Sequence, residues 1–378
     1  MQPTDLSPEI YSLIVKSLGN RSDLCNMCRV SKPFQAAAER ALYNTLQMTE
    51  PAGTVALCEL LAEQKRLAPL VVALTVSFSD RSEASATDTD HSESSPVPEY
   101  WDAIARALRR TVHLRFLNIH IDNGGPADQA WILSGCQFQL KTFHCDLSWD
   151  GALISFLSTQ SALSDLNIAD FREDIPENAT ISALPPTVPR SLPTLSILEC
   201  TFTEAVALLV PGRPVTHIKS CFSRTEPAAK RAELDLLVFN LCLSTRPFLS
   251  VNIADSSYTE RFSQQFLSRL VNAFVPDPQL RYSGPFALPV DGRERLRFYA
   301  LLRQLVYLQC TELDVSTWDP PPVSVPAMRA LASELHIYCP SVTAIIFLHD
   351  LEPTIVRIVN GIWRVDHDVV PDTLWRDV

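Results

Sequence analysis

One apolar pattern recurs through most of this chain and limits the folds that the chain can adopt. In residues 114–119 the apolar side chains Leu114, Leu117 and Ile119 stand at positions one, four and six of a six-residue frame. A short strand that buries Leu117 and Ile119 turns the residue between them to the opposite face, because successive side chains of a strand alternate. The frame returns, in part more weakly, at Leu140/Phe143/Cys145, Leu163/Leu166/Ile168, Leu195/Leu198/Cys200, Val215/Ile218, Phe248/Val251/Ile253, Cys310/Leu313/Val315 and Val342/Ile345/Phe347.

Helical patterns separate these frames. Their apolar residues recur three and four positions apart, as in an amphipathic helix. Parallel strands linked by helices, stacked unit on unit at an irregular spacing of about 20–40 residues, form a solenoid of repeats. We therefore predict an α/β fold, a curved solenoid with parallel strands on the concave face and helices outside. The helices are expected at residues 55–65, 100–110, 151–159, 229–243, 258–274, 293–304 and 328–338.

The residue between the last two apolar positions of each frame is nearly always polar. These central positions are expected on one exposed face, where they would form a row that contacts a target protein. A solvated face without a partner has the same appearance in sequence. In the last frame Ile346 interrupts the row, which indicates a more buried terminal strand or an apolar contact. The polar residues are Asn118, His144, Asn167, Glu199, Lys219, Asn252 and Asp314.

The first fifty residues follow a different pattern, that of three short helices. Ser7 stands at a capping position, Pro8 suits the first helical turn, and Glu9 favours the positive end of the helix dipole. Breaks at residues 19–20 and 30–31 separate the helices. A three-helix piece of this size has little core of its own, so it is expected to lean on a neighbour or a partner.

An ordered series of residues runs through this segment: Leu6-Ser7-Pro8-Glu9-Ile10, Leu18, Ser22-Asp23-Leu24, Cys28-Arg29-Val30-Ser31, Phe34, Ala38 and Ala41-Leu42-Tyr43. The series resembles an F-box, most closely that of fungal adaptor proteins, and spans roughly the first forty to fifty residues. The family most often has Pro directly after the first Leu, whereas here Ser7 intervenes. The family often has Trp where this chain has Phe34.

The resemblance implies a binding role. An F-box docks on the Skp-type linker subunit of a cullin-RING ubiquitin ligase. The frames behind it resemble, in architecture, the divergent leucine-rich-repeat-like arrays that accompany many fungal F-boxes. The implied linker-binding residues, some of which must instead form the internal core, are Leu6, Pro8, Ile10, Ile14, Leu18, Leu24, Val30 and Phe34.

These patterns divide the chain. We predict a docking module over residues 1–46 and a leucine-rich-repeat-like solenoid over residues 47–378. Within the solenoid, residues 79–97 are rich in Ser, Thr, Asp and Glu and predict a flexible acidic insertion. The insertion could carry phosphorylation sites or be a solvated loop.

Composition indicates which classes of partner and which compartment to expect. A net charge of −11 argues against nucleic acid, for which a basic stripe is expected. No apolar stretch is long enough to span a membrane, and no signal peptide is visible. The ten cysteines are scattered among apolar residues, as is typical of small core residues in a reducing compartment. A cytoplasmic or nuclear protein is expected.

The chemical motifs are weak, so we predict no catalytic residues, no metal site and no cofactor. Cys25 and Cys28 form a CxxC pair, but a structural zinc site needs four ligands, and the pair is better explained by helix packing. Asp366-His367-Asp368 fits a solvated segment. Glu312 and Asp314 have a spacing compatible with acid–base work, but a row of polar side chains explains them more simply.

Three functions remain open. The first is a non-enzymatic adaptor of a Skp–cullin–F-box ubiquitin ligase, in which the helices bind the linker and the array binds an unknown protein substrate. The second is a repeat scaffold for protein–protein interaction, with the N-terminal helices as a cap only. The third, an enzyme, requires a deep pocket with convergent titratable groups.

Overall fold

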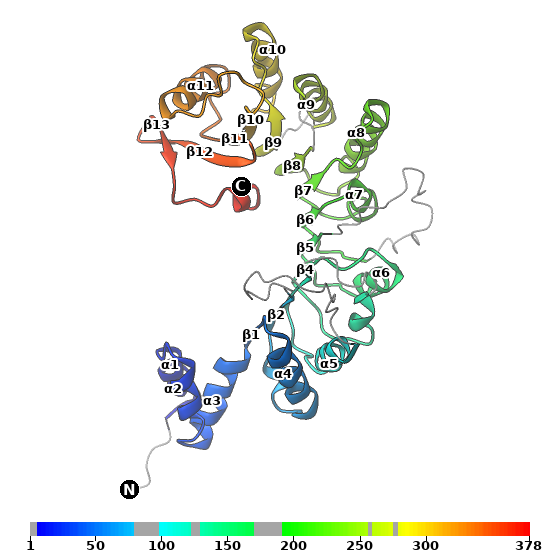
Figure 1. The fold of residues 1–378 in the computed structure, drawn as a ribbon, viewed down its shortest axis with the longest axis vertical. Coiled ribbons are helices and arrows are strands. Elements are labelled where there is room, and N and C mark those ends of the chain that lie inside the picture. The colour runs from blue at the N-terminus through cyan, green and yellow to red at the C-terminus, as the bar shows by residue number, and fades with distance from the viewer. Residues whose placement is uncertain (1–5, 79–97, 122–128, 170–190, 256–258, 275–278) are drawn as a thin grey trace, which may run out of the picture. The chain divides into compact units, whose positions relative to one another are not determined.

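A computed structural model describes residues 6–78, 98–121, 129–169, 191–255, 259–274 and 279–378. The chain divides into two compact units, Met1–Leu192 and Pro193–Val378. Each unit is an α/β structure (Figure 1). The predicted acidic insertion, residues 79–97, lies outside the described residues.

The first unit opens with the three predicted helices, α1 (Pro8–Lys16), α2 (Arg21–Met27) and α3 (Lys32–Tyr43). Ser7 is the residue before α1 and Pro8 is its first residue, but the Ser7 side chain makes no capping hydrogen bond. Asn20 and Ser31 do cap, because their side chains accept hydrogen bonds from the Ser22 and Phe34 amides.

The rest of the first unit alternates strands with helices. Strand β1 begins at Thr45, so residues 45 and 46 belong to the sheet and not to the predicted docking module. Figure 1 shows α4, α5 and α6 on one side of the strands. The elements are β1 (Thr45–Met48), α4 (Pro51–Glu63), η1 (Ala68–Leu70), β2 (Ala73–Phe78), α5 (Pro98–Leu108), β3 (Phe116–Ile121), η2 (Gln129–Leu133), β4 (Thr142–Cys145), α6 (Gly151–Ser158) and β5 (Asp165–Ile168).

All strand pairs in this unit are parallel, and their register aligns the apolar frames. One buried row runs straight across the strands beneath the helices, and its side chains are at most 2% exposed. Since each strand contributes the residue that its frame predicts, the period-two alternation of a strand explains the core. The row consists of Leu46, Leu74, Leu117, Phe143 and Leu166.

The second unit repeats this arrangement and then reverses direction. Helices α7 to α11 lie on one side of its strands (Figure 1). The elements are β6 (Ile197–Cys200), α7 (Thr203–Leu209), β7 (His217–Cys221), α8 (Pro227–Leu241), β8 (Ser250–Ala254), α9 (Glu260–Phe274), β9 (Tyr282–Ala287), α10 (Gly292–Leu302), β10 (Cys310–Asp314), α11 (Val325–Tyr338), β11 (Ala344–His349), β12 (Glu352–Val359), β13 (Ile362–Asp366) and η4 (Pro371–Arg376).

Strands β6 to β11 are parallel, whereas β12 and β13 pair antiparallel on the edge of β11. Beneath the helices the core row continues through this unit, and every member is fully buried. Two of its members are polar, Ser283 and Thr311, and the Thr311 hydroxyl donates to the Ser283 carbonyl oxygen at 3.0 Å. The row consists of Leu198, Ile218, Val251, Ser283, Thr311 and Ile345.

These two polar core residues explain what the apolar pattern did not predict. Strand β9 was not predicted, because Ser283 stands where a leucine is expected and Pro285 interrupts the run. The frame Cys310/Leu313/Val315 was wrong by two positions, since the register places Thr311, and not Leu313, in the core row with Ser283 and Ile345. Helix α7 and strand β12 were also not predicted.

The cysteines agree in part with the expectation of small core residues. Five of the ten are buried, at positions 58, 145, 200, 310 and 339, and all ten are free thiols. Burial raises the pKa of Cys200 and of Cys310 to about 12, so both stay protonated. None of the helices in the described ranges combines the length and the apolar character that crossing a bilayer requires.

A substitution at Gly284 tests the packing of β9 against β10. This glycine has a φ of +151°, and a Cβ there would stand 2.7 Å from the Glu312 carbonyl oxygen. We expect Gly284→Ala to lower the free energy of unfolding by about 2–4 kcal/mol, from backbone strain and overpacking. Chemical denaturation measures the loss.

Gly292 provides the matched control, because it begins α10 and a Cβ there would meet open space. Gly292→Ala should stabilise the chain by up to about 1 kcal/mol through the reduced entropy of the unfolded state. Equal effects at both glycines would contradict the close approach of β10 to Gly284.

Candidate functional site

Helix α1 has two apolar faces, and only one of them packs. Tyr11 and Val15 are buried on the inner face. On the outer face Leu6, Ile10 and Leu13 are 43%, 40% and 66% exposed. Residues three positions apart share one side of a helix, so Ile10 and Leu13, together with Leu6 just before the first helical turn, form an exposed apolar stripe.

The eight residues implied by the F-box resemblance divide between this surface and the internal core. Leu24 is buried in the core, in the cluster with Val15 and Ala38, and Leu18 and Phe34 pack against that cluster. Phe34 also meets the Tyr11 ring edge to face, with centroids 4.7 Å apart. Ile14 is half-buried, and the exposed members are Leu6, Pro8, Ile10 and Val30.

A groove of about 310 Å³ lies on the same module, between α1 and α3. Leu6, Pro8 and Tyr11 line one wall, and Pro33 and Ala37 line the other. The groove is mostly apolar, so it can accept an apolar side chain from a partner. Sequence spacing alone did not predict it, because it forms only when α3 crosses α1.

The CxxC pair does not pack as predicted. Cys28 lies against the core cluster of the module, but Cys25 is exposed, so the prediction of core packing was wrong for Cys25. No group of three or more His, Cys, Asp or Glu side chains converges as a metal site within the described ranges.

The strand face opposite the helices, here called the open face, carries polar side chains in both units. In the first unit Asn118, His144 and Asn167 lie side by side in register. Gln47 and Thr75 extend the same row, although the first two strands gave no complete frame. These side chains are exposed or half-buried, and His144 Nε2 lies 3.5 Å from an Asp165 carboxylate oxygen.

In the second unit Glu199, Lys219 and Asn252 lie in register on the open face. The row continues to Glu312, because the Asn252 amide donates to the Glu312 carboxylate at 2.9 Å. Asp314 lies outside this row. It is buried, and its carboxylate accepts a hydrogen bond from the Ser316 amide at 3.0 Å.

Ile346 follows Glu312 in register, is 1% exposed and packs in a cluster with Trp375, so it is an apolar contact; its strand β11 is not the terminal strand, because β12 and β13 pair beyond it. The Tyr282 hydroxyl donates to Glu312 at 2.7 Å. Burial raises the pKa of Glu312, while this hydroxyl, Lys219 and the Asn252 amide act in the opposite direction. Glu312 and Asp314 therefore have separate partners, Asn252 and Tyr282 for Glu312 and Ser316 for Asp314.

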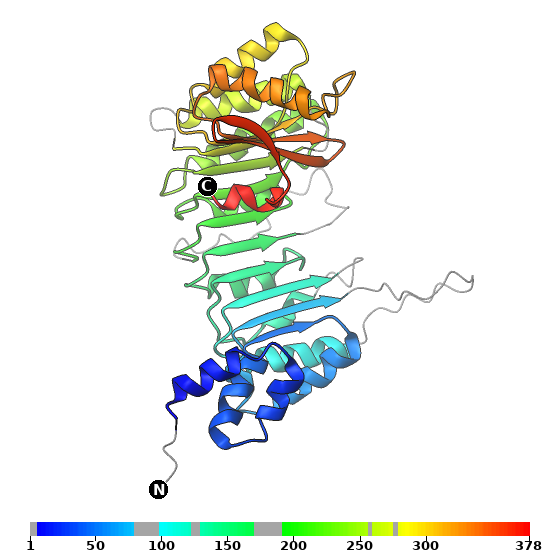
Figure 2. The ribbon, with the colours of Figure 1, turned by 90° about the vertical axis from the view of Figure 1, so that its left-hand side faces the viewer.

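The last eight residues, 371–378, lie on this open face of the second unit and are here called the returning segment (Figure 2). Trp375 is 1% exposed. The Arg376 guanidinium donates to the Glu199 carboxylate, and the Val378 carbonyl oxygen lies 3.2 Å from His217 Nε2. Residues far apart in sequence thus meet here, which no short-range pattern predicts.

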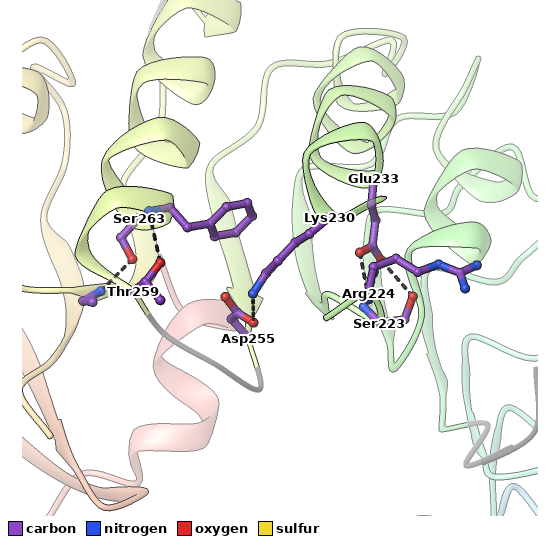
Figure 3. A network of polar contacts seen from close by, with 9 residues as sticks. Ser223, Arg224, Lys230, Glu233, Asp255, Thr259 and Ser263 are labelled. Carbon is purple, nitrogen blue, oxygen red and sulfur yellow. Dashed lines mark hydrogen bonds and ion pairs between the residues drawn. The ribbon is translucent and has the colours of Figure 1, made fainter. Parts of the chain in front are cut away.

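A second polar network lies at the carboxyl ends of β7 and β8, where α8 and α9 begin (Figure 3). The Lys230 ammonium pairs with the Asp255 carboxylate, and both side chains are more than nine-tenths buried. The Glu233 carboxylate accepts hydrogen bonds from the Ser223 and Arg224 amides, at 2.9 and 3.1 Å. Lys230 and Glu233 both belong to α8, so these contacts hold α8 on the strand ends.

A larger groove of about 620 Å³ lies along α8 and α9. Its lining includes Arg231, Arg261 and Arg269, together with amide side chains. Arg269 pairs with Asp235 at 3.2 Å. Its three arginines outnumber the single aspartate, so the lining carries a net positive charge, and the predicted polar row is not part of it.

Comparison with known proteins adds no relative. No protein-family model matches the chain, and no curated protein matches it significantly.

The buried Lys230–Asp255 pair allows a double-mutant test. We expect Asp255→Leu to lower the free energy of unfolding by about 3–5 kcal/mol, because it leaves a buried ammonium without its counter-ion. Adding Lys230→Met should recover most of this loss, since an apolar pair of similar volume replaces the ions. Denaturant unfolding measures all three variants.

The exposed Arg269–Asp235 pair is the matched control. Asp235→Leu should change the free energy of unfolding by less than about 1 kcal/mol. An additive double variant of Lys230 and Asp255 would show that the two groups do not interact.

The pH dependence of stability tests His217. Burial lowers its pKa below the ordinary value of 6.5, and the nearby Arg376 and Arg281 act in the same direction. Below pH 6.5 the unfolded chain therefore binds a proton that the folded chain resists, so the free energy of unfolding falls as the pH drops.

We expect His217→Gln to lose less stability than the wild type between pH 8 and pH 5, as measured by denaturant unfolding. The exposed His113, changed to Gln in the same way, is the control. Identical pH profiles for the wild type and His217→Gln would count against a buried imidazole at this position.

Proposed function

We propose that this protein is a non-enzymatic substrate-recognition adaptor of a Skp–cullin–F-box ubiquitin ligase. In this role the helices α1 to α3 bind a Skp-type linker subunit, which joins the chain to a cullin. The strand array binds a protein target on its open face. Other subunits transfer ubiquitin, and the adaptor raises the effective concentration of the target near them.

The observation that carries the proposal is the apolar stripe of Leu6, Ile10 and Leu13. A small module gains stability by burying such side chains, yet α1 buries its other face and leaves this one exposed. An exposed apolar stripe beside an apolar groove is what a helical docking surface requires. The F-box-like order of residues supports the same partner.

The array supports the target half of the proposal. In-register polar rows on an open strand face supply a continuous set of hydrogen-bond donors and acceptors. We propose that this array is a curved leucine-rich-repeat-like solenoid with its strands on the concave face. An adaptor of this kind works in the cytoplasm or the nucleus.

A scaffold without a ligase is the second candidate. Helix α3 contacts β1 and η1, and the Arg66 guanidinium pairs with the Glu39 carboxylate of α3. These contacts attach the helices to the array, as a cap requires. They leave the stripe on α1 uncovered, which favours the adaptor.

Binding of the full chain to a purified Skp linker, measured by calorimetry, tests the proposal. We expect Ile10→Asp together with Leu13→Asp to weaken binding at least 100-fold, because exposed apolar anchors are replaced by charges. Both side chains are exposed, so the variant should keep its fold.

Ile337→Asp is the matched control, since Ile337 is a 76% exposed apolar residue on α11. It should bind the linker as the wild type does. A folded wild-type chain that does not bind the linker would reject the adaptor and leave the scaffold.

A further inference from the structure

The open faces of the two units differ in exposure. In the first unit the residues two positions before the polar row are exposed or half-buried: Thr45, Ala73, Phe116, Thr142 and Asp165. In the second unit the in-register equivalents from β7 to β11 are at most 9% exposed: His217, Ser250, Tyr282, Cys310 and Ala344. The same architecture therefore has an open face that is covered in one unit and accessible in the other.

The returning segment contributes directly to this cover. Trp375 packs in a cluster with Tyr282, Cys310 and Ile346, and Leu374 lies against the same cluster. The segment also contacts β7, β8 and β12. An indole contributes more buried area than most side chains, so Trp375 anchors the segment.

Charge fixes the direction of the segment. The Arg376 guanidinium donates to Glu199 at 2.5 Å, while Lys219 lies 3.3 Å from the other Glu199 oxygen. His217 supplies a further contact at the Val378 carbonyl oxygen. The open face thus contacts an aromatic side chain, the adjacent guanidinium and a backbone carbonyl of the segment. A peptide that carries the same groups could make the same contacts.

We propose that the open face of β6 to β11 is a peptide-binding surface for a large aromatic residue followed by arginine, and that residues 371–378 occupy it in cis. A target that presents the same pair of side chains binds by displacing the returning segment. This inference extends the target half of the proposed function and is independent of linker binding.

The attachment of the returning segment permits displacement. The Asp377 and Thr373 amides donate to the Leu374 and Val370 carbonyl oxygens, and the Val378 carbonyl oxygen contacts the His217 side chain, so no strand pairing holds the segment among the described residues. The connection from β13 contains the exposed residues His367, Asp368 and Val370. The segment is therefore held by side-chain contacts and can leave without opening the sheet.

A labelled synthetic peptide of residues 367–378 is the probe, and fluorescence anisotropy measures its binding to the full chain. The wild type should bind it weakly, because the tethered copy competes at a high effective concentration. The variant Trp375→Ala with Arg376→Ala, which weakens the tethered copy, should bind at least tenfold more tightly.

Charge reversal makes the test specific. Adding Glu199→Arg to this variant should weaken binding of the probe about tenfold, and a probe carrying Arg376→Glu should restore it. Arg364→Glu, an exposed site on β13, is the matched control and should change nothing. If Trp375→Ala does not fold, the single variant Arg376→Ala decides by the same comparison with the wild type.

Two results would overturn the inference. One is a folded tail-weakened variant that binds the probe no better than the wild type. The other is probe binding that Glu199→Arg leaves unchanged. Linker binding, measured on the same variants, should equal that of the wild type, so a failure here is distinguishable from a failure of the adaptor proposal.

Discussion

The straight register of parallel strands is the constraint on which both units depend. Where neighbouring strands align residue by residue, as in β2 to β4 and in β7 and β8, the same frame position faces the same side. One side then becomes a dense row such as Leu117, Phe143 and Leu166, packed beneath helices. On the other side lie the residues between the apolar positions of each frame, because successive side chains alternate. A shift of one residue in a strand would turn the polar residue of that strand toward the helices and its core residue toward the open face.

The helical module depends on the array in a different way. Its own core centres on three buried side chains, Val15, Leu24 and Ala38, which is little for an independent domain. Contacts of α3 with β1 and η1 attach it to the first unit. The module can therefore keep Leu6, Ile10 and Leu13 exposed, because its contacts with the array contribute stability that does not depend on burying these three side chains.

The polar row has two environments with different physical consequences. In the first unit Asn118 and Asn167 remain accessible and can hydrogen-bond a partner. In the second unit Asn252 and Glu312 are already bonded to each other, and burial raises the pKa of Glu312. A partner there meets side chains that are already bonded to each other, and the returning segment instead bonds to Glu199 through Arg376. Recognition by the two units is therefore expected to follow different chemistry.

The sequence by itself determined the α/β class, the three N-terminal helices and the strands with a regular apolar frame, since these depend on local periodicity. It did not determine β9 or the register of β10, because Ser283 and Thr311 are polar residues that the tertiary structure buries. It assigned Asp314 to the row where Glu312 belongs. Only the tertiary structure decided which apolar residues of α1 stay exposed and that Trp375 covers the open face, because both depend on contacts between residues distant in the chain.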